Sequence, residues 1–296
     1  MNRLVIIGNG FDLFHGLNTS YKDFLTYLDN CPFDVEASTI IKQAYQELED
    51  KNWTDIETIY YKELLICFGD PETRRHLGQE IDEEDIKDLN KDLDVIKRHL
   101  ATYLGTQNQN QIVPNFTDIS LQRCTDHVHY QEPSNVFILN FNYTTPRFMG
   151  GVSKVNIHGT LNDVESMIFG YGDEADEIYP QIEKADIDEF LRNFKSHCYI
   201  QSNNYKDLSE FIDADEYQVM TVGHSCGRSD HVLLGEIFNH ENCKEIEVNY
   251  HQFTDGTDDF NSIAFNIGRA MPNKVEYRRK LKSKENCRTI AELHEE

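Results

Sequence analysis

The feature that most constrains this chain is an apolar strand near its start that runs directly into a glycine turn. Residues 4–7 are apolar, and Gly8-Asn9-Gly10 follows them at once. A buried strand that ends in closely spaced glycines and leads to a helix is typical of folds that bind an anion at a helix N-terminus. The stretch therefore predicts a phosphate or nucleotide site in the first unit of an α/β sheet. Because GNG lacks the full GxGxxG spacing, a tight turn without a ligand is the alternative.

Helices are predicted for most of the chain between this first unit and the next strand. Residues 12–19 are expected to form a polar loop, after which Ser20 and Asp23 fit a capping box that begins a helix. From residue 86 to residue 100, apolar residues recur at intervals of three and four, which indicates a helix packed on another helix, within the chain or across a dimer. Residues 20–115 are therefore expected to form a large helical insertion after the first βα unit, with a polar loop over 105–118.

Strand patterns return in the second half of the chain and alternate with helical patterns. Strands are predicted at 136–139, 152–157, 167–169 and 217–222, and a last one begins near residue 246. Helices are predicted between them, at about 180–197, 229–240 and 258–270. Such alternation predicts a single α/β domain over 1–296 with a Rossmann-like, mostly parallel sheet.

Composition narrows the class of protein. The chain carries 28 Lys and Arg against 52 Asp and Glu, a net charge of −24, which opposes binding to nucleic acid. The basic residues gather in a C-terminal segment, 271–296, which is expected to contact the acidic body or another subunit. The seven cysteines are scattered without a CxxC pair, so reduced thiols and no structural metal are expected. No apolar run reaches the roughly 18 residues of a membrane span, and a signal peptide's flanks are lacking, which favours a cytoplasmic protein.

Polar residues follow each predicted strand at its carboxyl end. Asn142 follows the strand at 136–139, and His158 follows the one at 152–157. Gly170-Tyr171-Gly172 follows the one at 167–169, and a loop from Gly223 through Ser225 to Asp230 follows the one at 217–222. In an open parallel sheet, ligands bind outside the carboxyl ends of the strands. These loops are therefore expected to open, together with residues 8–12, on one crevice that forms the functional site.

Five motifs closely resemble those of the AbiH family of bacterial abortive-infection (phage-resistance) proteins. They are IGNGFDLFHGLNTSYKDF at 7–24, WTDIE at 53–57, FNYT at 141–144, NIHG at 156–159 and GHS at 223–225, followed by Ser229 and Asp230. The resemblance covers nearly the whole chain and implies a role in phage defence. Within it, WTDIE is interpreted as a helix cap, with Thr54 and Glu57 as a capping box, and as a packing anchor.

The order of these motifs is also similar, more distantly, to that of sirtuin-type NAD-consuming folds. That similarity implies NAD as the substrate, with Gly8-Asn9-Gly10 as its glycine turn, Asn142 at the catalytic strand end and Asn249 on the adenosine ribose. The His158-Gly159 and Gly223-His224-Ser225 motifs match two further elements of that order. The two CxxC pairs of sirtuin deacetylases are missing, which argues against protein deacetylation.

A mechanism follows for cleavage of the nicotinamide–ribose bond. Asn142 would fix the ribose hydroxyls or the attacking water, and His158 would act as general base, a role that an ordinary pKa of about 6.5 suits. Gly8, Gly10 and Ser225 would hold the pyrophosphate.

Three further residues, Asp12, His15 and Asp230, would orient the second ribose or the nicotinamide amide. Their alternative readings are a loop cap for Asp12, a buried hydrogen-bonded histidine for His15 and a helix N-cap for Asp230.

Three functions remain open on this evidence. The first is an NAD⁺ glycohydrolase that acts as a phage-defence effector, as a homo-oligomer and in response to a phage-encoded trigger. The second is a non-catalytic sensor that binds NAD, ADP-ribose or a related nucleotide in the same crevice. The third is a metal-dependent nuclease, which the net charge and the lack of a compact ligand motif oppose.

Overall fold

The computed structural model describes residues 1–32, 37–51, 55–70, 81–107, 135–145, 153–172 and 176–295. In this part of the chain five strands form one all-parallel sheet: β1 (Asn2–Ile7), β2 (Val136–Asn140), β3 (Ser153–Asn156), β4 (Tyr217–Val222) and β5 (Cys243–Asn249). Their order in the sheet is β3-β2-β1-β4-β5. The predicted Rossmann-like α/β fold is confirmed, and the strand order reverses between β1 and β4, which is where such sheets bind ligands.

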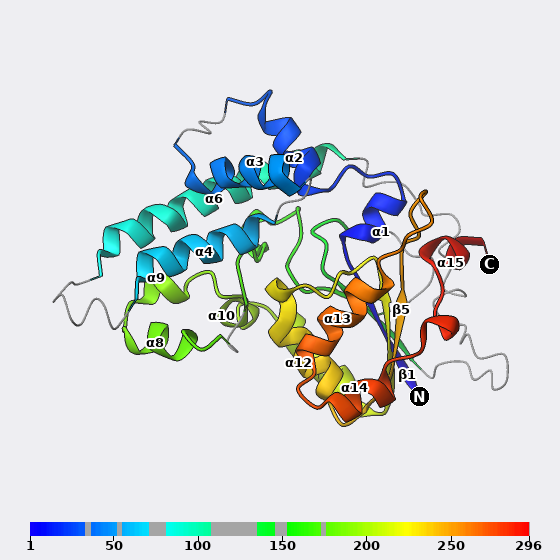
Figure 1. Ribbon diagram of the computed structural model, residues 1–296. Helices are drawn as coiled ribbons and strands as arrows, with labels where there is room; N and C mark the ends of the chain where they lie inside the picture. Colours follow the sequence, from blue (N-terminus) through cyan, green and yellow to red (C-terminus); the bar gives the residue numbers. More distant parts are fainter. Residues whose placement is uncertain are drawn as a thin grey trace.

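Helices cover both faces of the sheet, which is why its central strands read as continuous apolar runs. On one face, α11 (Asn204–Ala214), α12 (His231–Asn239) and α13 (Phe260–Ala270) pack on side chains that include Leu4 and Ile6. On the other face, α1 (Asn9–Phe14) and α15 (Ile290–Glu295) contribute Phe11 and Leu293 to a core with Val5. Helix α14 (Lys274–Lys280) runs beside β5. Figure 1 shows α12 and α13 on one side of the strands and α15 on the other.

The predicted helical insertion forms a second body with its own core. It contains α2 (Tyr21–Leu28), α3 (Thr39–Lys51), α4 (Ile56–Phe68) and α6 (Glu83–Thr106), and the short helices α8 (Tyr179–Lys184), α9 (Asp188–Leu191) and α10 (Lys195–Tyr199) pack against it. Figure 1 shows these helices side by side, away from the strands. The Ser20–Asp23 capping box of α2 is present as predicted.

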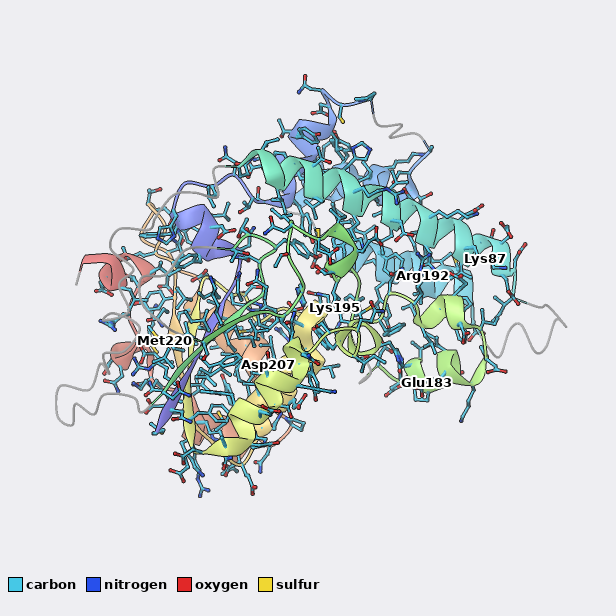
Figure 2. The ribbon with its side chains drawn as sticks, turned by 180° about the vertical axis from the view of Figure 1, so that it is seen from behind. Lys87, Glu183, Arg192, Lys195, Asp207 and Met220 are labelled. Carbon is cyan, nitrogen blue, oxygen red and sulfur yellow. The ribbon has the colours of Figure 1, made fainter. Side chains whose placement is uncertain are left out.

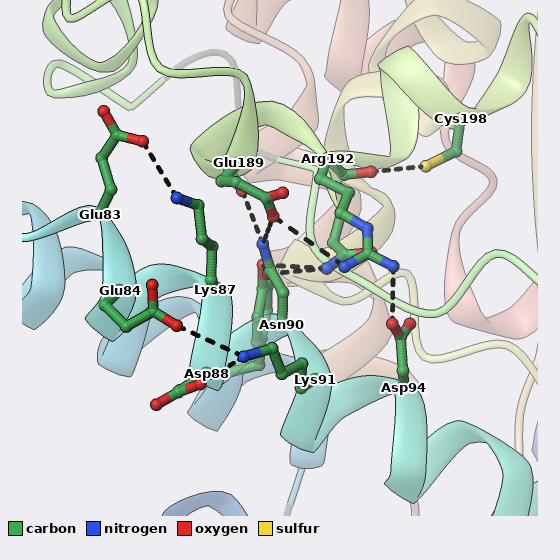
Figure 3. Close-up of polar contacts among 12 residues, drawn as sticks. Glu83, Glu84, Lys87, Asp88, Asn90, Lys91, Asp94, Glu189, Arg192 and Cys198 are labelled. Atoms are coloured by element: carbon green, nitrogen blue, oxygen red, sulfur yellow. Dashed lines mark hydrogen bonds and ion pairs between the residues drawn. The ribbon is translucent and has the colours of Figure 1, made fainter.

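The apolar stripe at 86–100 faces the inside of this helical body. Ile86, Leu93 and Ile96 on α6 are buried within the chain, in one core with side chains from α2, α3 and α4. Polar contacts add to this packing, because Arg192 after α9 reaches Asp94 at 2.6 Å (Figure 3). Of the two readings of the stripe, packing within the chain is therefore correct, and the stripe no longer argues for a dimer.

Several local expectations were wrong. The predicted loop at 12–19 begins inside α1, which starts directly after Gly8. Residues 167–169 are buried but form no strand, because none of the strands in the described part of the chain pairs with them. The helical pattern at 180–197 is broken into α8, α9 and α10, and α11 was not predicted. Most of the predicted loop at 105–118 lies outside the described residues.

The basic C-terminal segment contacts the acidic body of the same chain. Lys282 Nζ lies 3.0 Å from Glu245 and 3.1 Å from Glu247, and Lys284 Nζ lies 2.5 Å from Asp258. Short 3₁₀ turns occur at η1 (Val164–Ser166), η2 (Arg228–Asp230) and η3 (Lys284–Asn286). Over the described ranges, no helix combines the length and the apolar character that crossing a bilayer requires.

Candidate functional site

A cavity of about 840 Å³ opens at the carboxyl ends of the strands, between the sheet and the helical body. Ten of the eleven predicted site residues line it: Gly8, Asn9, Gly10, Asp12, Asn142, His158, Gly223, Ser225, Asp230 and Asn249. The eleventh, His15, is not among the lining residues, and its Nδ1 lies 2.7 Å from the carbonyl oxygen of Phe11. Segments far apart in the sequence thus meet around one space, at the switch point of the sheet.

The glycines of the first motif hold the loops after β1 and β4 together. Gly8 N–H donates to Val222 O at 3.1 Å, and Gly10 N–H donates to Gly223 O at 2.8 Å. Because both amides are already hydrogen-bonded, they do not serve as the pyrophosphate donors that the sequence suggested. Gly223 has a φ of 66°, and a Cβ there would lie 2.1 Å from the Phe11 nitrogen. Close backbone approach is therefore the reason for these glycines.

Asn142 and Asp12 lie together beside this glycine contact. Asn142 Nδ2 donates to Gly8 O at 3.1 Å, which ties the loop after β2 to the loop after β1. Thr144 Oγ1 donates to Asp12 Oδ2 at 2.5 Å. Burial raises the pKa of Asp12 to about 6, although hydrogen bonds from Thr144 and Asn142 oppose the rise. Asp12 is therefore a carboxyl group that changes its charge close to neutral pH.

His158 belongs to a buried polar cluster at the other side of the cavity. Its Nε2 lies 3.3 Å from Asp230 Oδ1 and 3.3 Å from the Tyr199 hydroxyl. Lys195 Nζ lies 2.8 Å from Asp230 Oδ1 and 3.1 Å from the Glu57 carboxylate. His224 Nε2 lies 3.6 Å from Asp230 Oδ2. Asp230 is therefore the centre of the cluster, with a contact to each of His158, Lys195 and His224.

The charges of this cluster follow from its burial and from the single lysine. Burial alone would raise the pKa of Asp230, but Lys195 and hydrogen bonds from both histidines lower it well below its ordinary value. Burial raises the pKa of Glu57 to about 8 despite the attraction of Lys195. Burial and the Lys195 charge lower the pKa of His158. At neutral pH the cluster therefore holds an ammonium, an ionised Asp230 and a neutral His158.

A neutral His158 beside an ionised Asp230 has a defined tautomer. The carboxylate can only accept, so the proton of the imidazole is assigned to Nε2, and Nδ1 is left to take a proton. Asp230 precedes α12 but makes no side-chain cap bond to it, so the helix-cap alternative for this residue is wrong. The arrangement is that of a general base held in orientation by a buried carboxylate.

Sequence reasoning missed Glu57 and Lys195. The capping box that was assigned to Thr54 and Glu57 is wrong: Asp55 caps α4 by accepting from the amides of Glu57 and Thr58, and Thr54 lies outside the described residues. The Glu57 side chain instead lines the cavity and accepts from Gly170 N–H at 3.2 Å. Lys195 lies within a weak helical pattern, and nothing local marks its side chain as buried.

The far end of the cavity lies at β5. Asn249 is fully buried, and its Nδ2 donates to Thr221 O at 3.2 Å. Its Oδ1 has no hydrogen-bond partner among the residues that the structure describes. Ser225 is exposed at the same end, and the side chains of His251 and Phe253 complete the wall. Within the residues that the structure describes, no three His, Cys, Asp or Glu side chains are grouped so as to hold a metal ion.

The comparisons with known proteins identify a family. A family model described as "Bacteriophage abortive infection AbiH" matches residues 4–252, which include every residue that lines the cavity except Phe253, Asp259, Ile263 and Ile290. No curated protein matches the chain.

Proposed function

This chain belongs to the AbiH family of bacteriophage abortive-infection proteins, and from this premise we propose that it is a phage-defence effector that hydrolyses NAD⁺ at the nicotinamide–ribose bond. The observation that carries the proposal is the buried pair of His158 and Asp230 on the wall of a nucleotide-sized cavity. Ligand pockets range over roughly 300–1,000 Å³, and the volume of this cavity lies within that range.

The chemistry of the cavity wall suits a reaction that develops positive charge. When the C1′–N bond breaks, its electron pair leaves with nicotinamide, and the ribose carbon becomes an oxocarbenium-like cation. Asp12 and Asp230 provide carboxylates on the wall, and carboxylates stabilise such a cation in a site of low dielectric.

The attack of water completes the reaction. Water adds to C1′, and His158 accepts the proton that the water loses, so that NAD⁺ and water give ADP-ribose, nicotinamide and a proton. Asn142, with an amide that both donates and accepts, orients the water or the ribose hydroxyls. The substrate enters from the cytoplasm, and the trigger in this proposal is phage-encoded and acts on an oligomer of the chain.

The test is nicotinamide release from NAD⁺ by the purified chain at high protein concentration. Wild type should release nicotinamide, and Asn142→Ala and His158→Ala should not. His240→Ala is the matched control, because His240 also lies 3.1 Å from an aspartate, Asp213, but outside the cavity. It should retain wild-type turnover.

Other results would assign the cavity differently. Saturable binding of NAD or ADP-ribose without release would contradict hydrolysis and support the alternative of a nucleotide sensor. Metal-dependent cleavage of nucleic acid without nicotinamide release would support the nuclease. Release that persists in His158→Ala would contradict the role of this histidine.

A further inference from the structure

We propose that Lys195 and Glu57, which belong to the helical body, are positioning residues that hold Asp230 against His158 and so complete the active site. This inference rests on the proposed function for its kinetic consequences but not for its structural ones. Neither residue was expected at the site from the sequence, and both act through Asp230 rather than on the substrate.

The contacts run in a line from the helical body to the sheet. Glu57 on α4 contacts Lys195 at the start of α10, Lys195 contacts Asp230 before α12, and Asp230 contacts His158 after β3. Side-chain exposures of 11% for Glu57, 2% for Lys195 and 5% for His158 show that little of this line reaches solvent. Figure 2 shows Lys195 in the middle of the molecule, between the helices of the helical body and the sheet.

The line contains one ammonium and two carboxyl groups. A buried carboxylate is strongly destabilised without a partner and takes up a proton instead. Lys195 removes that penalty for Asp230, which lies nearer to it than Glu57 does, at 2.8 Å against 3.1 Å. The ionised carboxylate then keeps the Nε2 proton of His158 in place.

His158 has charged or titratable neighbours on several elements, and the effect of Lys195 on its protonation has to be distinguished from theirs. Asp230, His224 and Lys195 surround it, the Tyr199 hydroxyl is 3.3 Å away, and the ring of Tyr143 lies 6.4 Å from its ring. Of these groups Lys195 alone is a permanent cation at neutral pH. Its removal therefore has a defined sign: the coupled pair of His158 and Asp230 must bind a proton more readily.

The test compares Lys195→Met with Lys282→Met. Lys282 is a matched control, because its side chain is about as buried as that of Lys195 and also lies between two carboxylates. Its partners are Glu245 and Glu247, whereas Lys195 contacts Asp230, the partner of His158. The ring nitrogens of His158 are titrated by NMR in each variant, with His158→Ala used to assign the signals. We expect a higher titration midpoint in Lys195→Met, a wild-type midpoint in Lys282→Met, and a midpoint restored toward that of wild type in Lys195→Arg.

Kinetics provide the second readout. In Lys195→Met we expect kcat for nicotinamide release to fall by about a hundredfold with little change in KM, as for a misplaced catalytic group. The acidic limb of its pH profile should move to higher pH. A structural role alone would lower the amount of folded protein and leave both the limb and the NMR midpoint unmoved, and that result would overturn the proposal.

The two proposals fail separately. If wild type releases no nicotinamide, the proposed function fails, but the titration of His158 still decides whether Lys195 acts on the pair. If Lys195→Met does not fold, Glu57→Gln takes its place, and its midpoint should lie at or below that of wild type because Lys195 keeps Asp230 as its charged partner. A midpoint above that of wild type would overturn the proposal.

Discussion

The amide of Gly10 donates to the carbonyl oxygen of Gly223 at 2.8 Å, so the first turn of α1 and the loop after β4 touch backbone to backbone. Strands β1 and β4 are neighbours at the point where the strand order of the sheet reverses. In sheets of this kind the two loops at the switch point usually diverge, and the ligand binds in the crevice between them. Here the glycines close the bottom of that crevice, and the polar side chains of Asn142, His158 and Asp230 are left to form its wall.

The first prediction concerns this contact. Gly223→Ala should destabilise the fold by about 3 kcal/mol or more, because the new Cβ meets the Phe11 nitrogen and the backbone is in the left-handed region. Gly16→Ala is the control: Gly16 has a similar φ of 79° but nothing within 4 Å of a Cβ, so it should cost about 1 kcal/mol. Denaturant unfolding measures both. Equal losses of unfolding free energy in the two variants would show that the close approach of Gly223 to Phe11 contributes nothing to the cost.

The second prediction concerns the charge of Asp12. Its pKa rises from 3.8 in a free side chain to about 6 in the fold, so its contribution to stability is complete below about pH 4 and is lost as the pH rises through about 6. Asp12→Asn removes this loss and should make the protein more stable at pH 7 by about 2–3 kcal/mol. Unfolding free energies measured from pH 4 to pH 8 test this, and parallel curves would contradict it.

Thr144→Val checks the cause of the same effect. Thr144 donates to Asp12, and this bond lowers the pKa of the carboxyl group. Without it the pKa of Asp12 in the fold should rise further, and the loss of stability should continue to higher pH. If the stability of Thr144→Val stops falling at a lower pH than that of wild type, burial of Asp12 is not the dominant cause of its raised pKa.

The third prediction compares two adjacent residues of α6. Asn90 is fully buried: its Nδ2 donates to Glu189 O at 2.8 Å, and its Oδ1 accepts from the Tyr60 hydroxyl at 2.8 Å. Asn90→Ala leaves these partners unsatisfied and should cost about 2–3 kcal/mol. Lys91 pairs with Asp88 on the exposed side of the helix (Figure 3), so Lys91→Ala should leave the unfolding midpoint unchanged.

The sequence predicted features that depend on neighbouring residues better than features that depend on contacts between distant parts of the chain. The strands β1, β2 and β4 were recognised because largely apolar runs of their length record burial on both faces. The last strand was expected to begin near residue 246, but β5 begins at Cys243, where charged residues interrupt the apolar pattern. Residues 167–169 have the same local character, but no strand within the described ranges pairs with them. The polar ends of the strands that do form were predicted correctly to share one cavity, since parallel strands bring their carboxyl ends to one edge. The residues after 167–169, Gly170 to Gly172, were expected there too but do not line it.

No local sequence pattern predicts the buried ion pair of Glu57 and Lys195 at the site. Glu57 resembles part of a helix cap, and its partner Lys195 lies 138 residues further along the chain. Burial of both depends on how the helical body docks on the sheet. Asp230 likewise resembles a helix cap until Lys195 and His158 are seen beside it. His158 and Asp230 were therefore predicted from the sequence, but Lys195 and Glu57, which link this pair to the helical body, were not.

The last prediction uses Glu57 to measure how the two carboxyl groups share Lys195. The pKa of Glu57 is raised to about 8, above the 4.5 of an ordinary glutamate, so its contribution to stability is complete below pH 4.5 and is lost as the pH rises through about 8. Glu57→Gln lacks this loss, and its melting temperature should gain on that of wild type between about pH 5 and pH 8. In a Lys195→Met background the gain should continue to higher pH, because the ammonium that lowers the folded-state pKa of Glu57 is gone. A gain that is the same at every pH would mean that Glu57 is ionised throughout this range, and that both carboxylates are charged beside one lysine.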